Sequence, residues 1–291
     1  MKTVGLIGCG RMGRGIAKNL IASGYTVFAY DPDPVAISHV EKLGAKTGDT
    51  VDTIAGKVDF LCTSLPAAEV LEEVVDVALE TMKKHSFILD MGTTDVEVTK
   101  RIFQKASDKG VSYYDCPVSG GPAGAENGTL TFMVGGSQER FGEVRNFLLA
   151  LGDDIHFVGP SGSGQIVKLC NNMVVAGITV LLSETMIVAE NAGVPSEKMA
   201  AIMQAGSGNN AVLNIFGDNI IHKSYDNVLF QLSLMAKDLK LFNNFSESQG
   251  FQPMASKLIS QLYEKAVNHN QGQLDNAAIR KLLEEEVGQL T

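Results

Sequence analysis

The chain has 291 residues, of which 45% are hydrophobic and 20% are charged, and its formal net charge is −9 at pH 7. This length is enough for two domains with a sizeable core. The acidic balance argues against a nucleic-acid binder, which would carry a basic patch, and against a polybasic membrane anchor.

Short apolar runs alternate with helical patterns through the first half of the chain. Such alternation predicts βαβ units and a parallel sheet whose two faces are both covered by helices. The predicted strands are Thr3–Ile7, Thr26–Tyr30, Asp59–Ser64, Phe87–Asp90, Ser112–Asp115 and Leu130–Val134. The predicted helices between them include Met12–Ser23, Ala67–Lys83 and Val96–Lys109.

The first predicted strand runs directly into a Gly-x-Gly-x-x-Gly pattern that opens the first predicted helix. Gly8 permits the tight turn, Gly10 lets the backbone approach a pyrophosphate, and Gly13 allows the helix to pack closely on the strand. The helix N-terminus adds free N–H groups and partial positive charge. The candidate cofactor-binding residues of this loop are Gly8, Cys9, Gly10, Arg11, Met12 and Gly13.

The second predicted strand ends at Asp31, where an acidic residue can hydrogen-bond the ribose diol of a dinucleotide and repel a 2′-phosphate. The following Pro32-Asp33-Pro34 brings no arginine or lysine. We therefore predict that the cofactor is NAD and not NADP. The alternative is that Asp31 is a surface residue in a turn before proline, with no ligand.

Two further strand ends face the same crevice, because ligands of open parallel sheets bind outside the carboxyl ends of the strands. Leu65 and Pro66 follow one strand, and Thr93 follows the next. These three residues are candidates to line the nicotinamide side, although ordinary turn residues fit their positions equally well.

Ser119-Gly120-Gly121 follows another predicted strand. Consecutive glycines expose backbone N–H groups, and the serine hydroxyl adds a further donor, so the segment is suited to holding a carboxylate. The alternative is a flexible glycine turn.

Lys168 is the only formally charged side chain between Asp154 and Glu184, and it follows a glycine-rich turn at the start of a long apolar helix. Lysine is almost never fully buried without a partner, because burying its charge unpaired is costly. Lys168 therefore either extends its amine to water or is a catalytic ammonium beside a bound substrate.

Beyond about Pro160 the strand signal fades and helical patterns follow one another. Gly193 is expected to end the long helix and Ser196 to cap the next one. The predicted helices are Gln165–Gly193, Ser196–Gln204, Leu232–Gln249, Pro253–Asn268 and Asn276–Glu286. The predicted fold class is α/β, with a Rossmann-like doubly wound parallel sheet in residues 1–162 and an all-α domain in residues 163–291.

The four cysteines form no Cys-x-x-Cys pair, and the five histidines show no ligand spacing. We expect reduced, mostly buried thiols in a cytoplasmic protein and no metal site. The apolar stretch Val4–Ile7 is too short for a signal peptide, and Met173–Leu182 is too short for a membrane span, so no membrane contact is expected.

Four segments together resemble the β-hydroxyacid dehydrogenase family, the 3-hydroxyisobutyrate dehydrogenase type, and their order spans nearly the whole chain. They are Gly5-Leu-Ile-Gly-Cys-Gly-Arg-Met-Gly, Asp115-Cys-Pro-Val-Ser-Gly-Gly, Gly162-Ser-Gly-Gln-Ile-Val-Lys-Leu-Cys-Asn-Asn and Lys237-Asp-Leu. The family usually has a small residue where Cys116 stands, a departure that could reshape the edge of a pocket.

The resemblance implies a role for several residues. Ser119, Gly120 and Gly121 match the segment that binds the substrate carboxylate, and Lys168 matches the catalytic lysine. Asn172 matches an asparagine that orients the substrate; at i+4 it shares a helix face with Lys168, whereas Asn171 is expected to point elsewhere. Lys237 matches a lysine near the nicotinamide end of the cleft, and Asp238 is expected to play a structural part beside it.

The resemblance also implies the reaction. A lysine can take the hydroxyl proton of a small 3-hydroxy acid while hydride passes to NAD, and can return it in the reverse direction. Two alternatives act on other substrates with the same architecture: a reductase of succinic, tartronic or sulfolactaldehyde-like semialdehydes, and a 2-(hydroxymethyl) dicarboxylate dehydrogenase. A third alternative is a non-catalytic NAD-binding module.

The helical domain is expected to pair as a homodimer or homotetramer, as the resemblance implies. Candidates for the substrate side-chain pocket lie in Gly206–Ala211, at Phe230-Gln231 and in the loop after Gly121. Asn209 and Asn210 could bind a polar substrate tail or cap a turn.

Overall fold

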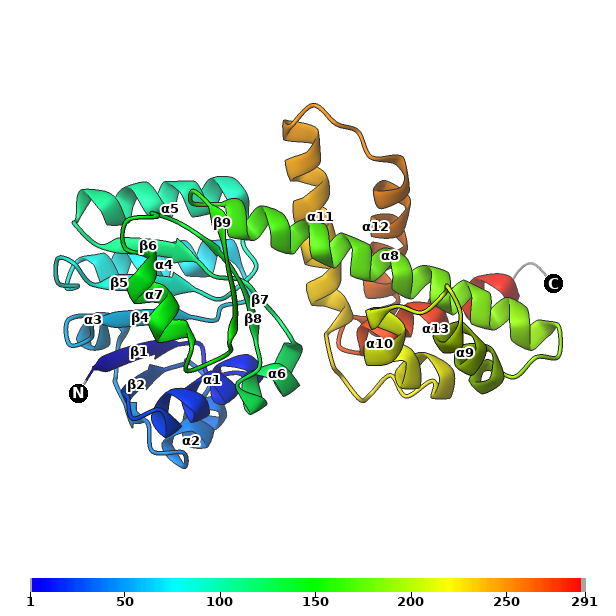
Figure 1. Ribbon diagram of the computed structural model, residues 1–291, viewed down its shortest axis with the longest axis horizontal. Helices are drawn as coiled ribbons and strands as arrows, with labels where there is room; N and C mark the ends of the chain where they lie inside the picture. Colours follow the sequence, from blue (N-terminus) through cyan, green and yellow to red (C-terminus); the bar gives the residue numbers. More distant parts are fainter. Residues whose placement is uncertain (1, 289–291) are drawn as a thin grey trace. The chain divides into compact units, whose positions relative to one another are not determined.

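The computed structural model describes residues 2–288 and, for residues 286–288, only the backbone. The chain divides into two compact units, Met1–Lys168 and Leu169–Thr291. The division falls inside the long helix α8 (Ser163–Asn191), at whose start the sequence placed the domain boundary (Figure 1).

The first unit is built on a single mixed sheet whose strand order is β3-β2-β1-β4-β5-β6-β8-β7, with β9 pairing β8. Its strands are β1 (Thr3–Ile7), β2 (Thr26–Tyr30), β3 (Lys46–Thr47), β4 (Phe60–Thr63), β5 (Phe87–Asp90), β6 (Ser112–Asp115), β7 (Val118–Ser119), β8 (Thr131–Gly135) and β9 (Asp154–Gly159). Its helices are α1 (Arg11–Ala22), α2 (Pro34–Glu41), α3 (Val51–Ala55), α4 (Ala68–Leu79), α5 (Val96–Asp108), α6 (Gly121–Asn127) and α7 (Phe141–Leu148).

The strands from β3 to β6 run parallel, and β1 lies between β2 and β4. The chain order therefore reverses at β1, which makes the loop after β1 the topological switch point where open α/β sheets bind ligands. β8 departs from this order because it runs antiparallel to β6 and β7. β7 consequently ends at the same edge of the sheet as β6.

Both faces of the sheet are buried, which explains why its strands do not alternate strictly between apolar and polar residues. In β1, Val4 and Leu6 belong to a core that includes residues of α1, α2 and α7. Ile7 belongs to the opposite core, which includes residues of α3, α4 and α5. The predicted Rossmann-like sheet covered by helices is confirmed.

The second unit is helical, and its helices after α8 are α9 (Ser196–Ala205), α10 (Ala211–His222), α11 (Leu232–Ser248), α12 (Met254–Ala266) and α13 (Ile279–Gly288). One core joins α8, α11, α12 and α13, and another joins α8, α9 and α10. The sequence did not predict α10. Its apolar residues are interrupted by Gly217 and by several polar residues.

The start of α9 differs from the prediction. Gly193 has a φ of +84° and follows the end of α8, as expected for a C-terminal glycine. Ser196, however, is the first helical residue and makes no cap; Pro195 occupies the capping position. The Ser196 hydroxyl instead donates a hydrogen bond to Glu190, so a buried ion-pair network has replaced the predicted cap.

α8 is long and apolar enough to cross a membrane by length and composition alone. About half of its apolar window (56%) is buried inside the protein, and residues from Met173 to Met186 contribute to both cores of the second unit. A core helix accounts for this burial.

Candidate active site

In the loop after β1, the three glycines differ in the space that surrounds them and therefore in why a side chain is absent. Gly8 has a φ of +94°, and a Cβ there would lie 2.3 Å from the Ser64 carbonyl oxygen. A Cβ at Gly13 would lie 2.0 Å from the Gly8 oxygen, whereas a Cβ at Gly10 would meet no protein atom within 4 Å. Gly8 and Gly13 are thus required by the fold, while the space in front of Gly10 is open to a ligand.

The N-terminus of α1 beside this space has no capping side chain. Gly10 occupies the capping position, and the first turn contains no acidic residue. The first N–H groups of a helix have no partner within the helix and carry partial positive charge. The residues present therefore fit the pyrophosphate of a dinucleotide.

Asp31 follows β2 and is joined to the glycine loop. Its Oδ2 accepts a hydrogen bond from the Cys9 N–H at 2.7 Å, and its Oδ1 accepts one from the Asp33 N–H at 2.8 Å. An ionised carboxylate has about four lone-pair sites, so acceptor capacity remains for two ribose hydroxyls. Asp33 caps α2 by accepting from the Val35 N–H, so its carboxylate is engaged in local structure.

Leu65, Pro66 and Thr93 lie on neighbouring loops at the same sheet edge. A Cβ added to Gly92 would lie 3.1 Å from the Leu65 oxygen, which shows how closely the two loops approach. Leu65 and Thr93 are half-buried, and Pro66 is exposed. The structure thus brings these residues to the edge that carries the glycine loop.

Ser119, Gly120 and Gly121 lie at the end of β7 and the start of α6. Ser119 is half-buried and pairs with Thr131 of β8. Gly120 and Gly121 have φ values of +118° and +59°, a region that favours glycine. The glycines are therefore required by the backbone path here, in addition to any part they play in binding.

Lys168 is buried, with 8% of its surface exposed, in the second turn of α8. The start of this helix is fixed by Asp115, whose carboxylate accepts from the Gly162 N–H at 2.8 Å and the Gln165 N–H at 3.1 Å. Burial raises the pKa of Asp115 above its usual range. The helix that carries Lys168 therefore begins directly on the carboxyl end of β6.

Asn172 lies one turn further along α8 and is also buried. Its Nδ2 donates to Asp238 Oδ2 at 2.6 Å, and Lys237 Nζ lies 3.1 Å from Asp238 Oδ1. Within the second unit, Asp238 thus brings Asn172 and Lys237 together. Asn171, expected to point elsewhere, donates through its Nδ2 to Asn172 Oδ1 at 3.2 Å.

Two polar pocket candidates of the second unit, Asn210 and Gln231, make local side-chain hydrogen bonds. Asn210 caps α10, with its Oδ1 accepting from the Leu213 N–H. The Phe230 N–H donates to Asp275, and the Gln231 side chain donates to Gln273. For Asn210 these contacts favour the capping interpretation over a contact with substrate.

Sequence reasoning did not single out three buried polar residues beneath the loops: Asp90, Asp115 and Gln165. Asp90 and Asp115 are register partners at the ends of adjacent parallel strands. A signal was available, since two predicted strands each end in aspartate. Gln165 is the first residue of the predicted helix Gln165–Gly193, three residues before Lys168, and its sequence context carries no separate signal.

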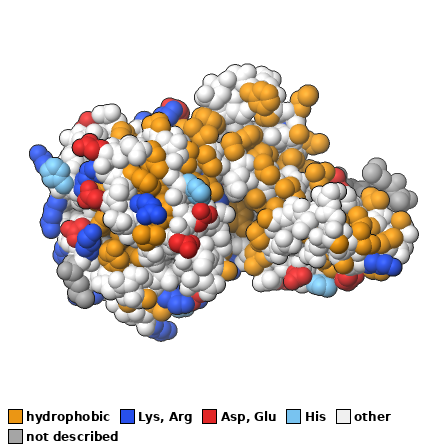
Figure 2. All heavy atoms as spheres, viewed as in Figure 1, with side chains coloured by type: hydrophobic (Ala, Val, Ile, Leu, Met, Phe, Trp, Pro, Cys, Tyr) orange, Lys and Arg blue, Asp and Glu red, His pale blue; other side chains and the backbone are white. Residues whose placement is uncertain are grey.

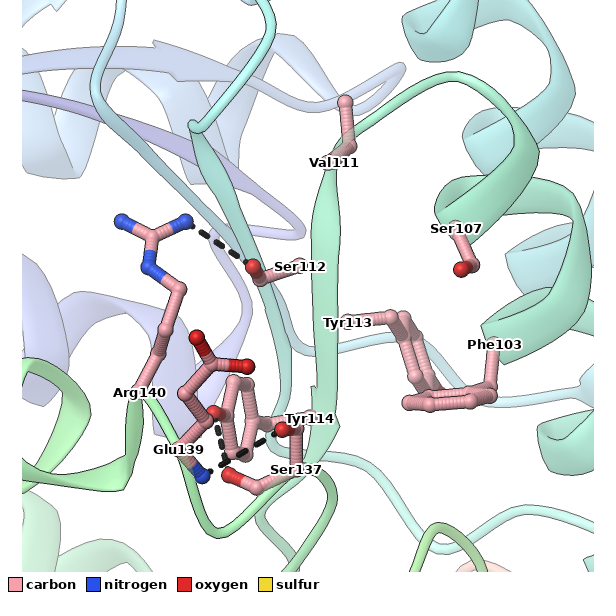
Figure 3. Close-up of a pocket in the computed structure, with 9 residues that line it drawn as sticks. All are labelled: Phe103, Ser107, Val111, Ser112, Tyr113, Tyr114, Ser137, Glu139 and Arg140. Carbon is pink, nitrogen blue, oxygen red and sulfur yellow. Dashed lines mark hydrogen bonds between the residues drawn. The ribbon is translucent and has the colours of Figure 1, made fainter.

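A hollow of about 220 Å³ lies away from these residues, around the start of β6 (Figure 3). Its one arginine, Arg140, donates to Ser112 Oγ at 2.9 Å and pairs with Glu143, so that cation is already engaged. Among the side chains that the structure describes, those of residues 2–285, no group of three or more from His, Cys, Asp or Glu could hold a metal ion. Cys9, Cys62 and Cys116 are buried, and Cys170 is exposed.

The chain is similar to known dehydrogenases along nearly its whole length. Residues 3–159 match the family described as the NAD binding domain of 6-phosphogluconate dehydrogenase. Residues 162–283 match the family described as NAD-binding of NADP-dependent 3-hydroxyisobutyrate dehydrogenase.

Individual relatives agree with these family matches. The 2-(hydroxymethyl)glutarate dehydrogenase of Eubacterium barkeri is 31% identical, over 98% of this chain and 96% of that protein. The NAD-dependent L-serine dehydrogenase of Pseudomonas aeruginosa is 31% identical, over 99% of this chain and 100% of that protein. The structure of Mycobacterium tuberculosis 3-hydroxyisobutyrate dehydrogenase with L-serine superposes with a TM-score of 0.89 at 26% identity, covering 97% of this chain and 99% of that one.

Proposed function

Because the chain belongs to the β-hydroxyacid dehydrogenase family and is an NAD-dependent hydroxyacid dehydrogenase, we propose that it interconverts a small 3-hydroxy acid and its semialdehyde. One observation carries the choice of substrate class. The substrates named for the relatives, 2-(hydroxymethyl)glutarate, L-serine and 3-hydroxyisobutyrate, each carry a hydroxymethyl group on the carbon that bears a carboxylate. These substrates differ in the third substituent of that carbon, so the proposal specifies the hydroxymethyl group and the carboxylate and not that substituent.

Lys168 is the general acid and base of this proposal. It accepts the proton of the substrate hydroxyl during oxidation and donates a proton to the carbonyl oxygen during reduction. Its burial at the start of α8 supports the role, because an amine held there is kept from bulk water. NAD, when bound, supplies the hydride acceptor.

The carboxylate and the cofactor are held by the other residues. Ser119, Gly120 and Gly121 bind the substrate carboxylate through hydroxyl and backbone donors, and Asn172 orients the substrate. The glycine loop and Asp31 hold the dinucleotide. Leu65, Pro66, Thr93 and Lys237 lie toward its nicotinamide end.

The test is a substrate panel followed by substitution of Lys168. We expect wild-type protein to oxidise NADH with at least one semialdehyde of a 2-substituted 3-hydroxypropanoate, and to prefer NADH over NADPH. Lys168→Ala should lower kcat by about 100- to 10,000-fold, the range for loss of a general acid or base. Lys100→Ala is the matched control, because Lys100 is an exposed lysine paired with Glu97 on α5.

Two outcomes contradict the proposal. Wild-type protein that binds NADH tightly yet turns over no member of the panel would favour a non-catalytic module. Equal kcat values for wild type and Lys168→Ala would show that Lys168 is not the general acid and base, and would not contradict the proposed substrate class.

We further infer that the second unit pairs with another copy of the chain. Val174, Leu181 and Val188, here called the α8 stripe, are spaced seven residues apart and are 61%, 61% and 67% exposed. Figure 2 shows hydrophobic side chains gathered along this part of the helical unit. Large exposed apolar patches are typical of interaction sites, and two copies related by a two-fold axis bury the same patch twice.

A further inference from the structure

We propose that Gln165 is a positioning residue that fixes the loop Gly92–Thr94 to the helix carrying Lys168. The proposal rests on the proposed function for its catalytic consequence, since Lys168 and Thr93 are the groups that it positions. Its structural basis lies entirely within the first unit, Met1–Lys168.

The carboxamide of Gln165 binds the backbone on both sides of Thr93. Gln165 Oε1 accepts a hydrogen bond from the Thr94 N–H at 3.0 Å, and Gln165 Nε2 donates one to the Gly92 oxygen at 3.0 Å. The side chain is fully buried. It therefore pairs with this loop as the peptide group of an adjacent strand would, and the residue between the two bonds is Thr93.

Asp90 sets the orientation of that carboxamide. Gln165 Nε2 also donates to Asp90 Oδ2 at 3.4 Å, and the same carboxylate accepts from Thr63, from Thr94 Oγ1 and from the Gly92 N–H. Exchanging the amide oxygen and nitrogen of Gln165 would place oxygen against a carboxylate and nitrogen against an N–H. Only one orientation of the amide satisfies all the groups around it.

The backbone of Gln165 is fixed as firmly as its side chain. Its N–H donates to Asp115 Oδ2 at 3.1 Å. A Cβ at the neighbouring Gly164 would lie 2.3 Å from the Met133 oxygen, so the helix start is pressed against β8. Lys168 is three residues further along the same rigid helix, at a neighbouring position on its surface.

Gln165 consequently links two parts of the proposed site that come from distant segments. Thr93 lies toward the nicotinamide, and Lys168 handles the proton. A displacement of about 1 Å between reacting groups can cost about 100-fold in rate. Removing the linkage should therefore slow the chemical step more than it weakens binding of either reactant.

The test replaces Gln165 with methionine, which keeps a similar volume but makes none of the three side-chain hydrogen bonds. Ser183→Ala is the matched control, because Ser183 is a buried residue of the same helix whose hydroxyl makes one hydrogen bond, to the Thr179 oxygen. Gln165→Asn is the second variant if the methionine protein does not fold, since its shorter side chain cannot reach both loop groups.

Amide hydrogen exchange is the first readout and needs no substrate or cofactor. We expect the segment containing Thr94 to lose protection in Gln165→Met, while the same segment in Ser183→Ala exchanges as in the wild type. The second readout is turnover: kcat should fall about 10- to 100-fold with KM and the NADH dissociation constant within about threefold of wild type. The kinetic isotope effect with NADH deuterated at nicotinamide C4 should rise, because hydride transfer becomes more rate-limiting.

Each outcome is decisive. Unchanged exchange at Thr94 overturns the linkage itself. Lost protection with an unchanged isotope effect, and with kcat reduced only in proportion to the folded fraction, overturns the positioning role and leaves Gln165 a structural residue. If the wild type is inactive on every substrate, the proposed function fails. The hydrogen-exchange measurement still tests whether Gln165 fixes the loop Gly92–Thr94.

Discussion

At the scale of single residues, the proposed cofactor loop depends on three glycines, each at a position where a side chain would be harmful. Gly8 and Gly13 omit a side chain because the backbone around them is crowded, and Gly10 omits one where the protein offers no contact at all. The same residue type therefore serves folding at two positions and ligand approach at a third. This division gives two substitutions with opposite expected effects.

Gly10→Ala should leave the fold intact and weaken cofactor binding. Gly10 has a negative φ of −61° in an extended backbone and open space around its Cα, so the stability of the apo protein should change by less than about 1 kcal/mol. The dissociation constant for NADH, measured by fluorescence, should rise at least tenfold. Gly13→Ala should instead lower the thermal midpoint of the apo protein, and the reverse pattern would contradict the assignment of the loop.

Asp90 should make stability fall as the pH rises. Burial, opposed by hydrogen bonds from Thr63, Gly92 and Thr94 and supplemented by the charge of Asp115, raises the pKa of Asp90 to about 6. Between about pH 4 and pH 6 the folded protein holds a proton that the unfolded chain, with a pKa of about 3.9, has released. The stability contributed by protonated Asp90 is therefore complete below pH 4 and is lost, by about 3 kcal/mol, as the pH rises through 6.

The measurement is the free energy of urea unfolding of wild type and Asp90→Asn at pH 4 and pH 7. The difference between the two proteins should shift by about 3 kcal/mol in favour of the variant at pH 7. Other carboxylates with lowered pKa values, such as the half-buried Glu72 and the exposed Glu143, are present in both proteins and cancel in the difference. A difference that is flat with pH would show that Asp90 titrates as an ordinary carboxyl.

At the scale of elements, the sequence predicted the strands and helices whose hydrophobic pattern is contained in their own residues. Thr3–Ile7 and Phe87–Asp90 are short, mostly apolar segments that form central strands, and their predicted bounds agree with the structure. The two-residue strands β3 and β7 are too short to carry a periodic pattern, and α6 is built on glycines whose conformations come from tertiary contacts. The linkage through Gln165 was not predictable either, because it joins residues more than 70 positions apart.

The ends of four helices in the second unit meet at one buried guanidinium. Arg280 of α13 is fully buried; it donates to Glu284 at 2.9 Å and to the Ile220 oxygen at 2.9 Å, and it pairs with Glu190 of α8. The same group approaches Ser196 at the start of α9. Charge and hydrogen bonding at this one side chain therefore hold α8, α9, α10 and α13 together.

Arg280→Met should destabilise the second unit and spare cofactor binding. Breaking a buried pair costs about 3–5 kcal/mol, and about 3 kcal/mol is expected here because the Glu190 side chain is one-third exposed. Far-UV circular dichroism during urea unfolding measures the loss, and NADH affinity at 25 °C should change less than twofold. Arg101→Met is the matched control, since Arg101 pairs with Glu72 on the surface and should cost less than about 1 kcal/mol. Equal losses for the two variants would contradict the role given to Arg280.

At the scale of the whole molecule, the two units differ in whether their main elements leave apolar side chains exposed. The first unit surrounds its sheet with helices and buries both faces. The second unit buries one side of α8 in its cores and leaves the α8 stripe exposed. Lys168 and the cofactor loops belong to the first unit, whereas Asn172 and Lys237 belong to the second.

Leu181→Glu should dissociate the assembly that we infer for this chain. In a two-fold interface each substitution acts twice, and burying one such side chain contributes about 1.5–3 kcal/mol, so the change removes several kcal/mol and adds two carboxylates close together. Light scattering should give a dimer or tetramer for the wild type and a monomer for the variant. Val35→Glu is the matched control, because Val35 is 60% exposed on α2 of the first unit and should leave the mass unchanged. A monomeric wild type would refute the pairing, and equal dissociation by both variants would place the interface elsewhere.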